Sequence, residues 1–149
     1  MGWLILRVFL LVTLIAAIFT GCVQQQQQPQ PPQVQEVKIG VLAPKTGVFQ
    51  SAGVAMENAA RLAEKHVKEM NLAGNYQITL VIADAGSTPE QATSAFLQLA
   101  QQDVVAVVGA YSSAQAIAVA KAAEEAGIVY IASVASTPQL EEMIKQGSS

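Results

Sequence analysis

The chain has 149 residues, of which 13% are charged, and its formal net charge is −3 at pH 7. This mild acidity argues against nucleic-acid binding, and an aromatic content of 5% argues against a base-stacking platform. A single cysteine excludes an internal disulfide, and with a single histidine it also excludes a catalytic triad and the usual zinc sites. We therefore expect no catalytic residue, no metal site and no cofactor.

The first 21 residues have the layout of an export signal. Arg7 precedes an almost purely apolar run at 8–19, and small residues lead into Cys22. This layout resembles the lipobox of prokaryotic lipoproteins, in which cleavage leaves a lipid-modified cysteine as the new N-terminus. Phe19 departs from that motif, which usually has an aliphatic residue there. We predict a signal peptide at 1–21 and lipidation of Cys22.

Other interpretations of this segment fit less well. An uncleaved membrane-spanning helix needs about 20 apolar residues, and the apolar stretch at 8–23 is shorter. N-myristoylation of Gly2 lacks the required Ser or Thr, because Leu6 occupies that position. A buried free cysteine is disfavoured because a Gln/Pro-rich tract follows Cys22 directly.

The Gln/Pro-rich tract has no apolar period, so it predicts a solvated spacer. Lipidated Cys22 and this tract form an expected tether at 22–36, which would hold a folded domain at 37–149 close to a membrane surface. The length of the chain without its signal is sufficient for one domain, but not comfortably for two.

From residue 37 onward, four apolar runs of strand length alternate with helical stretches. The expected strands lie at 37–43, 77–83, 104–109 and 128–132. The expected helices lie at 52–71, 89–102, 113–126 and from 138 onward. The runs are continuous rather than alternating, which is typical of strands covered on both faces. The strand–helix alternation predicts an α/β fold with a doubly wound parallel sheet.

The first helical stretch carries an apolar stripe, and two i,i+4 charge pairs are expected outside it: Glu57 with Arg61, and Glu64 with Lys68. The stripe consists of Met56, Ala59, Ala60, Ala63, Val67 and Met70. His66 lies at the edge of the stripe and is expected to be a half-buried surface histidine.

The helix ends are marked by capping residues. Capping boxes occur at 88–91 and 112–115, and residues 136–137 offer a capping hydroxyl before a proline. Gly74 and Gly127 occupy positions expected of C-terminal glycines.

In open parallel sheets, ligands bind beyond the carboxyl ends of the strands. The four expected loops there lie at 44–51, 84–88, 110–113 and 133–137. They offer hydroxyls and helix N-termini but few charges, which suits an anionic head group such as a carboxylate.

Structural interpretations of the same residues remain open. Thr88, Ser112 and Thr137 are equally explained as plain N-caps. Lys45 is explained as a solvated loop lysine, and Asp84 as a turn former or capping group.

Motifs of common α/β enzymes are missing. No G-x-G-x-x-G follows the first expected strand, and residues 40–47 do not fit a P-loop. A phosphoacceptor receiver domain would need acidic residues after that strand, where residues 43–45 are Ala, Pro and Lys. An enzyme is therefore the weakest hypothesis.

Four segments, at 37–47, 84–92, 107–113 and 127–138, resemble in order and spacing the branched-chain amino-acid-binding proteins. These are type I periplasmic solute receptors of ABC importers. The resemblance extends without a large gap from about residue 37 to 140. It implies the N-terminal lobe of a two-lobed receptor, incomplete because the later strands and the second lobe do not follow.

The resemblance also implies which residues would bind a ligand. In this family the first lobe grips the α-amino and α-carboxylate groups with a serine after the third strand, and with a backbone carbonyl and a hydroxyl after the fourth. These roles fall on Ser113, on the backbone of Val134 and on Ser136. A one-residue shift would bring in Ser112 and Ala135. An aromatic residue often packs on the ligand from the first loop, where this chain has Ala52, with Phe49 three residues earlier.

We therefore expect a lipid-anchored extracytoplasmic solute-binding protein, or a truncated first lobe of one. It would deliver branched-chain amino acids or similar small carboxylate solutes to an ABC permease. Its expected partners are an amino-acid or amide-like ligand, the permease, and the membrane through the lipid, but no nucleic acid. The alternative is a stand-alone ligand-sensing or protein-interaction module derived from the same lobe. A third hypothesis is an enzyme of flavodoxin-like architecture.

Overall fold

The computed structural model describes residues 34–147, so the predicted signal, Cys22 and most of the tether lie outside the described residues. Strands and helices alternate as predicted, with boundaries within two residues of expectation. The strands are β1 (Gln35–Ala43), β2 (Tyr76–Asp84), β3 (Val104–Gly109) and β4 (Val129–Ala132). The helices are η1 (Gly47–Phe49), α2 (Gln50–Glu69), α3 (Pro89–Ala100), α4 (Ser113–Ala126) and α5 (Pro138–Gly147). No helix in the described part is long and apolar enough to cross a membrane.

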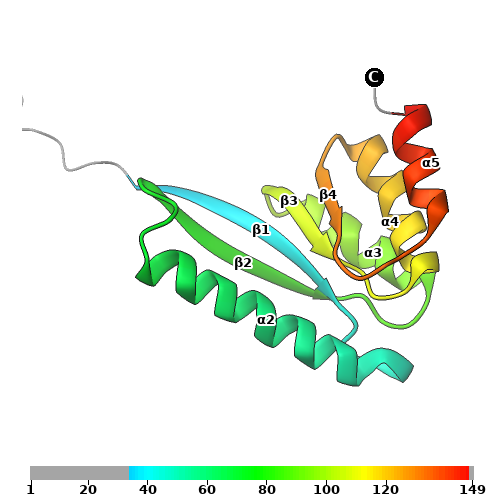
Figure 1. Ribbon diagram of the computed structural model, residues 1–149, viewed down its shortest axis with the longest axis horizontal. Coiled ribbons are helices and arrows are strands. Elements are labelled where there is room, and N and C mark those ends of the chain that lie inside the picture. Colours follow the sequence, from blue (N-terminus) through cyan, green and yellow to red (C-terminus); the bar gives the residue numbers. More distant parts are fainter. Residues whose placement is uncertain (1–33, 148–149) are drawn as a thin grey trace, which may run out of the picture. The chain divides into compact units, whose positions relative to one another are not determined.

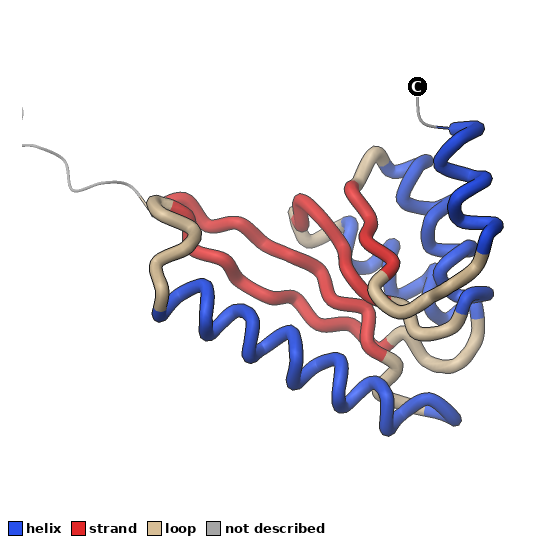
Figure 2. The backbone as a smooth tube through the Cα atoms, in the orientation of Figure 1, coloured by secondary structure: helices blue, strands red, loops and turns tan. Residues whose placement is uncertain are grey.

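The four strands form one parallel sheet in the order β2-β1-β3-β4, which confirms the doubly wound α/β prediction. Helix α2 runs along β1 and β2 on one face, and α3 and α4 pack on the opposite face (Figures 1 and 2). The chain leaves β1 toward β2 and then returns past β1 to β3. The strand order therefore reverses between β1 and β3, and ligands of open α/β sheets bind at such a switch point.

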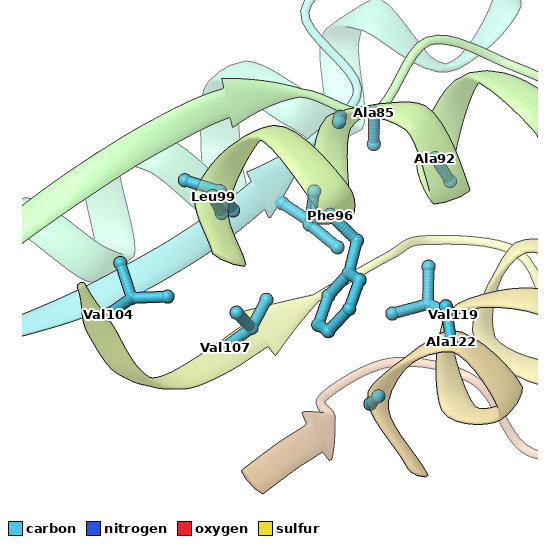
Figure 3. Close-up of a cluster of buried hydrophobic side chains, with 11 residues drawn as sticks. Ala85, Ala92, Phe96, Leu99, Val104, Val107, Val119 and Ala122 are labelled. Atoms are coloured by element: carbon cyan, nitrogen blue, oxygen red, sulfur yellow. The ribbon is translucent and has the colours of Figure 1, made fainter. Parts of the chain in front are cut away.

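The core lies between the sheet and the α3–α4 pair. Phe96 of α3 is completely buried, and its ring lies between Val107 of β3 and Val119 of α4 (Figure 3). Alanines complete the contact between the two helices, since Ala92 and Ala116 are also fully buried. Small side chains let α3 and α4 approach each other and the sheet closely, so one aromatic ring fills most of the remaining space.

The predicted stripe of α2 is wider than the surface that the sheet covers. Ala59, Ala63 and Met70 are exposed, while Met56, Ala60 and Val67 are half-buried. The two glutamates that were expected outside the stripe are half-buried as well. Glu64 accepts a hydrogen bond from the backbone N–H of Leu80 at 3.1 Å, which replaces the expected pairing with Lys68. The Glu57–Arg61 pair is present at 2.7 Å.

One face of β3 and β4 is open, contrary to the prediction that the strands are covered on both faces. The paired residues Ala106/Val129 and Val108/Ile131 lie on the same face as α2, but α2 packs mainly on β1 and β2. Val129 is 62% exposed and Ile131 is 55% exposed. We call these four residues the open face.

The helix ends follow their capping chemistry at most positions. Both predicted capping boxes are present, and Gly127 ends α4 in the left-handed conformation at φ 65°. Gly74 does not end a helix: α2 ends at Glu69, and Gly74 lies in the turn that follows. His66 is exposed rather than half-buried.

The start of α2 is fixed by a close approach that only glycine permits. A Cβ added at Gly53 would lie 1.9 Å from the carbonyl oxygen of Pro44, which is backbone and cannot rotate away. Gly53 is the one fully buried position of α2, so the absence of a side chain sets how closely the helix meets the end of β1.

We expect Gly53→Ala to lower the free energy of unfolding by about 2 kcal/mol, the usual cost of overpacking. This loss would occur although alanine is favoured over glycine in helices by about 1 kcal/mol. Urea denaturation followed by circular dichroism measures the change. Ala59→Gly, at an exposed position of the same helix, is the control and should lose about 1 kcal/mol through helix propensity alone. A more stable Gly53→Ala protein would contradict the close approach.

Candidate functional site

Four loops gather at the carboxyl edge of the sheet, at residues 44–46, 85–88, 110–112 and 133–137. Two backbone hydrogen bonds extend the sheet into them. The N–H of Ala85 donates to the carbonyl of Ala43, and the N–H of Ala110 donates to the carbonyl of Leu42, each at 3.0 Å. The second and third loops therefore begin against the end of β1, beside the switch point.

The three capping hydroxyls act as caps. The hydroxyls of Thr88 and Ser112 accept hydrogen bonds from the third residue of α3 and of α4, at 3.3 Å and 3.2 Å. The hydroxyl of Thr137 accepts one from the N–H of Gln139 at 3.4 Å. The hydroxyl of Ser112 is therefore already hydrogen-bonded to the first turn of α4.

Ser113 and Ser136 differ from Ser112 in this respect. Ser113 is the first residue of α4 and is half-buried, and Ser136 is exposed in the fourth loop. Neither side chain forms a hydrogen bond among residues 34–147. Val134 is also exposed, and Ala135 is half-buried. The loops that carry these residues leave the sheet side by side, because Gly109 at the end of β3 pairs with Ala132 at the end of β4.

A buried glutamine joins the second loop to the third. The side chain of Gln115 is completely buried, and its Nε2 donates to the carbonyls of Ala85 and Gly86 at 3.0 Å and 3.2 Å. Its Oε1 accepts from the N–H of Ser112 at 3.2 Å. The sequence identified Gln115 only as a capping-box residue. The bonds across to the second loop were missed, because a glutamine at this position of a capping box need not be buried.

Tyr130 joins β4 to the end of β3, where the third loop begins. Its phenol donates to the carbonyl of Gly109 at 2.9 Å, and burial raises the pKa of this phenol well above its ordinary value. The phenol therefore remains a neutral donor and holds the end of β3 against β4.

Asp84 joins the first loop to the second. Its carboxylate accepts hydrogen bonds from the N–H groups of Lys45, Thr46 and Gly86 and from the hydroxyl of Thr46, at 2.7 to 3.2 Å. Burial opposes ionisation, but the donors, with the N–H of Gly86 the strongest, outweigh it and hold the pKa of Asp84 below its ordinary value.

Two aromatic rings meet across the switch point. Phe49, which follows the first loop, lies with its ring centroid 5.1 Å from that of Tyr111 in the third loop, at an angle of 49°. Both residues are half-buried. This contact links the first loop to the segment that carries Ser112 and Ser113, and places an apolar wall beside them.

The hollows of the surface include only part of the predicted site. A mainly apolar groove of about 570 Å³ between α4, β4 and α5 is lined by Ala135 and Ser136, together with Leu140 and Met143, but not by Ser112, Ser113 or Val134. A slightly larger hollow of about 610 Å³ lies between α2 and the first half of β2, away from the carboxyl edge. In the described part of the chain, no cluster of side chains could hold a metal ion.

We expect Gln115→Leu to lower the free energy of unfolding by about 3 kcal/mol. Leucine fills a similar volume, but the substitution leaves buried carbonyl and N–H groups of two loops without partners, at about 1–3 kcal/mol for each group. Chemical denaturation measures the loss.

Gln91→Leu is the matched control, because Gln91 has the same position in the capping box of α3 but is exposed. The N–H groups that it releases can bond to water, so its loss should stay near 1 kcal/mol. Equal losses for the two variants would show that the bonds of Gln115 to the second loop add nothing.

Known proteins share this architecture and sequence. The model of the family described as periplasmic binding protein matches residues 36–143. An amino acid binding protein of Pseudomonas aeruginosa is 36% identical over 111 residues, which are 72% of this chain and 29% of that protein. A Leu/Ile/Val-binding protein of Rhizobium johnstonii, BraC3, is 31% identical over 70% of this chain and 29% of its own length.

A solved structure agrees with these matches. The branched-chain amino acid transporter substrate binding protein LivJ of Streptococcus pneumoniae, in complex with isoleucine, superposes with a TM-score of 0.66 and 30% identity. The superposed region makes up 72% of this chain and 31% of the LivJ chain. The chain thus spans less than a third of the length of each of these three proteins. Members of this family bind solutes and are not enzymes. The chain belongs to the periplasmic binding protein family, and its described residues form part of the type I fold of these receptors.

Proposed function

We propose that this chain is the first lobe of a lipid-anchored solute-binding protein that binds branched-chain amino acids, or similar small carboxylates, for an ABC importer. The observation that carries the proposal is the family match over residues 36–143, which covers all four loops of the carboxyl edge. The LivJ structure supports the ligand class, because its complex contains isoleucine.

The chemistry of the loops suits an amino acid head group. The carboxylate of the solute lies at the amino end of α4, where backbone N–H groups and the positive end of the helix favour an anion, and Ser113 donates its hydroxyl. The carbonyl of Val134 accepts from the ammonium group, and Ser136 adds a second hydroxyl. Ser112 has a supporting role, because its hydroxyl already caps α4. Ala135 borders the ligand only through its backbone.

The membrane anchor is supported by the sequence alone. The apolar run at 8–19, the small residues after it and Cys22 together form the signal of an exported lipoprotein. The lipid on Cys22 and the Gln/Pro-rich tether at 23–35 keep the binding lobe within reach of a permease in the same membrane.

We expect leucine, isoleucine or valine to stabilise the protein in a thermal-shift assay and to bind in a calorimetric titration. A ligand at 100 times its Kd raises the free energy of unfolding by about 2.7 kcal/mol. Ser113→Ala should weaken binding by about tenfold, because it removes a hydrogen bond to a charged group.

Ser94→Ala is the control, since Ser94 is an exposed serine on α3 and should leave the affinity unchanged. Equal affinities for the wild type and Ser113→Ala would remove Ser113 from the site. If a panel of amino acids, amides and short-chain acids gives no response with a monodisperse sample, the result would favour the stand-alone interaction module.

We expect Cys22→Ser to move the protein from the membrane fraction to the soluble fraction without changing its unfolding transition. Serine lacks the thiol that would carry the lipid, and the folded residues are untouched. Fractionation of producing cells followed by immunoblotting measures the distribution. Gly2→Ala, which would block only an N-myristoyl group, should leave the protein on the membrane. A membrane-bound Cys22→Ser protein would rule out the lipid anchor.

A further inference from the structure

Asp84 stands out because most of its hydrogen bonds leave its own loop. Its Oδ1 accepts from the N–H of Lys45 at 2.7 Å and from the N–H of Thr46 at 3.2 Å, and its Oδ2 accepts from the hydroxyl of Thr46 at 2.7 Å. Only the bond from the N–H of Gly86, at 2.9 Å, is local. A turn-forming role would need that local bond alone. The other three bonds tie β2 to the loop after β1.

Apart from the packing of buried Pro44 against Gly53, the first loop has two other polar contacts among residues 34–147. The hydroxyl of Ser87 donates to the carbonyl of Thr46 at 3.3 Å. The ammonium group of Lys45 lies 3.1 Å from a carboxylate oxygen of half-buried Glu57 on α2, but the lysine of this pair is exposed, and such pairs contribute little. The bonds to Asp84 are charge-assisted and converge on one group, so they are the strongest polar restraint on this loop.

The position of the first loop sets the apolar wall of the site. The ring of Phe49 in η1, which directly follows the first loop, contacts the ring of Tyr111 in the third loop, and Tyr111 is followed by Ser112 and Ser113. Phe49 is only three residues beyond Thr46, so a shift of Thr46 moves the ring. The restraint at Asp84 is thus transmitted to the site through Phe49.

We propose that Asp84 is a positioning residue of the solute site: it holds residues 45–49 so that Phe49 lies against Tyr111 beside Ser113. It acts through the first loop rather than by touching the solute. The sequence offered only a turn former or capping group at this position. The inference rests on the proposed function, since it assigns Asp84 a role in the affinity of that same site.

The test compares the leucine Kd, the free energy of unfolding and the ring contact in full-length variants. Asp84→Asn should weaken leucine binding by about tenfold, the loss expected for charge-assisted hydrogen bonds. It should also remove the nuclear Overhauser effect between the rings of Phe49 and Tyr111. Thr46→Val, which replaces only the hydroxyl, should weaken leucine binding less than Asp84→Asn does. Thr46→Ser, which keeps the hydroxyl, should bind leucine with the wild-type Kd. These Thr46 variants keep the test decisive if Asp84→Asn does not fold.

Glu36→Gln is the matched control. Glu36 accepts a hydrogen bond from the hydroxyl of Thr79 at 2.8 Å, so it makes the same carboxylate–threonine contact between β1 and β2 at the other end of the sheet. This variant should keep both the leucine Kd and the ring signal. If Asp84→Asn and Thr46→Val lose stability but keep the wild-type Kd, Asp84 is purely structural and the inference is wrong.

The failure of the proposed function gives a different result. A wild-type protein that binds neither leucine, isoleucine nor valine would overturn the proposed function, whatever the variants do. In that case the ring signal decides the inference by itself. Its loss in Asp84→Asn but not in Glu36→Gln would support the restraint on the first loop, and its persistence in both would overturn it.

Discussion

The buried amide of Gln115 is the constraint on which the carboxyl edge of this protein depends. One fully buried side chain accepts from the third loop and donates to the second, so α4 cannot start elsewhere without leaving polar groups of both loops unpaired. Asp84 continues the connection from the second loop to the first, and Tyr130 joins β4 to the end of β3, where the third loop begins. Three different side chains therefore connect the first three loops and the ends of β3 and β4.

This arrangement explains how a lobe with few charges forms a defined ligand edge. Polar side chains with hydrogen bonds to neighbouring segments position the loops, together with the buried loop residues Pro44, Ala85 and Ala110. The α3–α4 core helps to position these side chains, because the close packing around Phe96 fixes where each helix begins. The packing of α4 in this core also positions Ser113, which directly follows the N-cap residue Ser112. Unlike the hydroxyl of Ser112, the hydroxyl of Ser113 is available to a ligand.

Local sequence patterns were sufficient to predict the order of elements, the parallel sheet and the capping boxes, because these depend on residues close together in the chain. Tertiary partners were not predictable in the same way. The stripe of α2 indicated a helix correctly, but it could not show that the sheet leaves Ala59 and Ala63 uncovered or that Glu64 bonds to Leu80. The separation of roles between Ser112 and Ser113, and the long-range bonds of Asp84, likewise appear only in three dimensions.

The open face has a consequence for the dynamics of the ligand edge. β4 has four residues, pairs on one side with β3 and is covered on one face only, so it gains less from burial than the central strands. A strand in this position should separate from the sheet more often than β1 or β3, and its amide protons should exchange with solvent sooner. Because the fourth loop begins at the end of β4, we expect the part of the edge that carries Val134 and Ser136 to open first. The α4 start, held by Gln115, remains formed while it does.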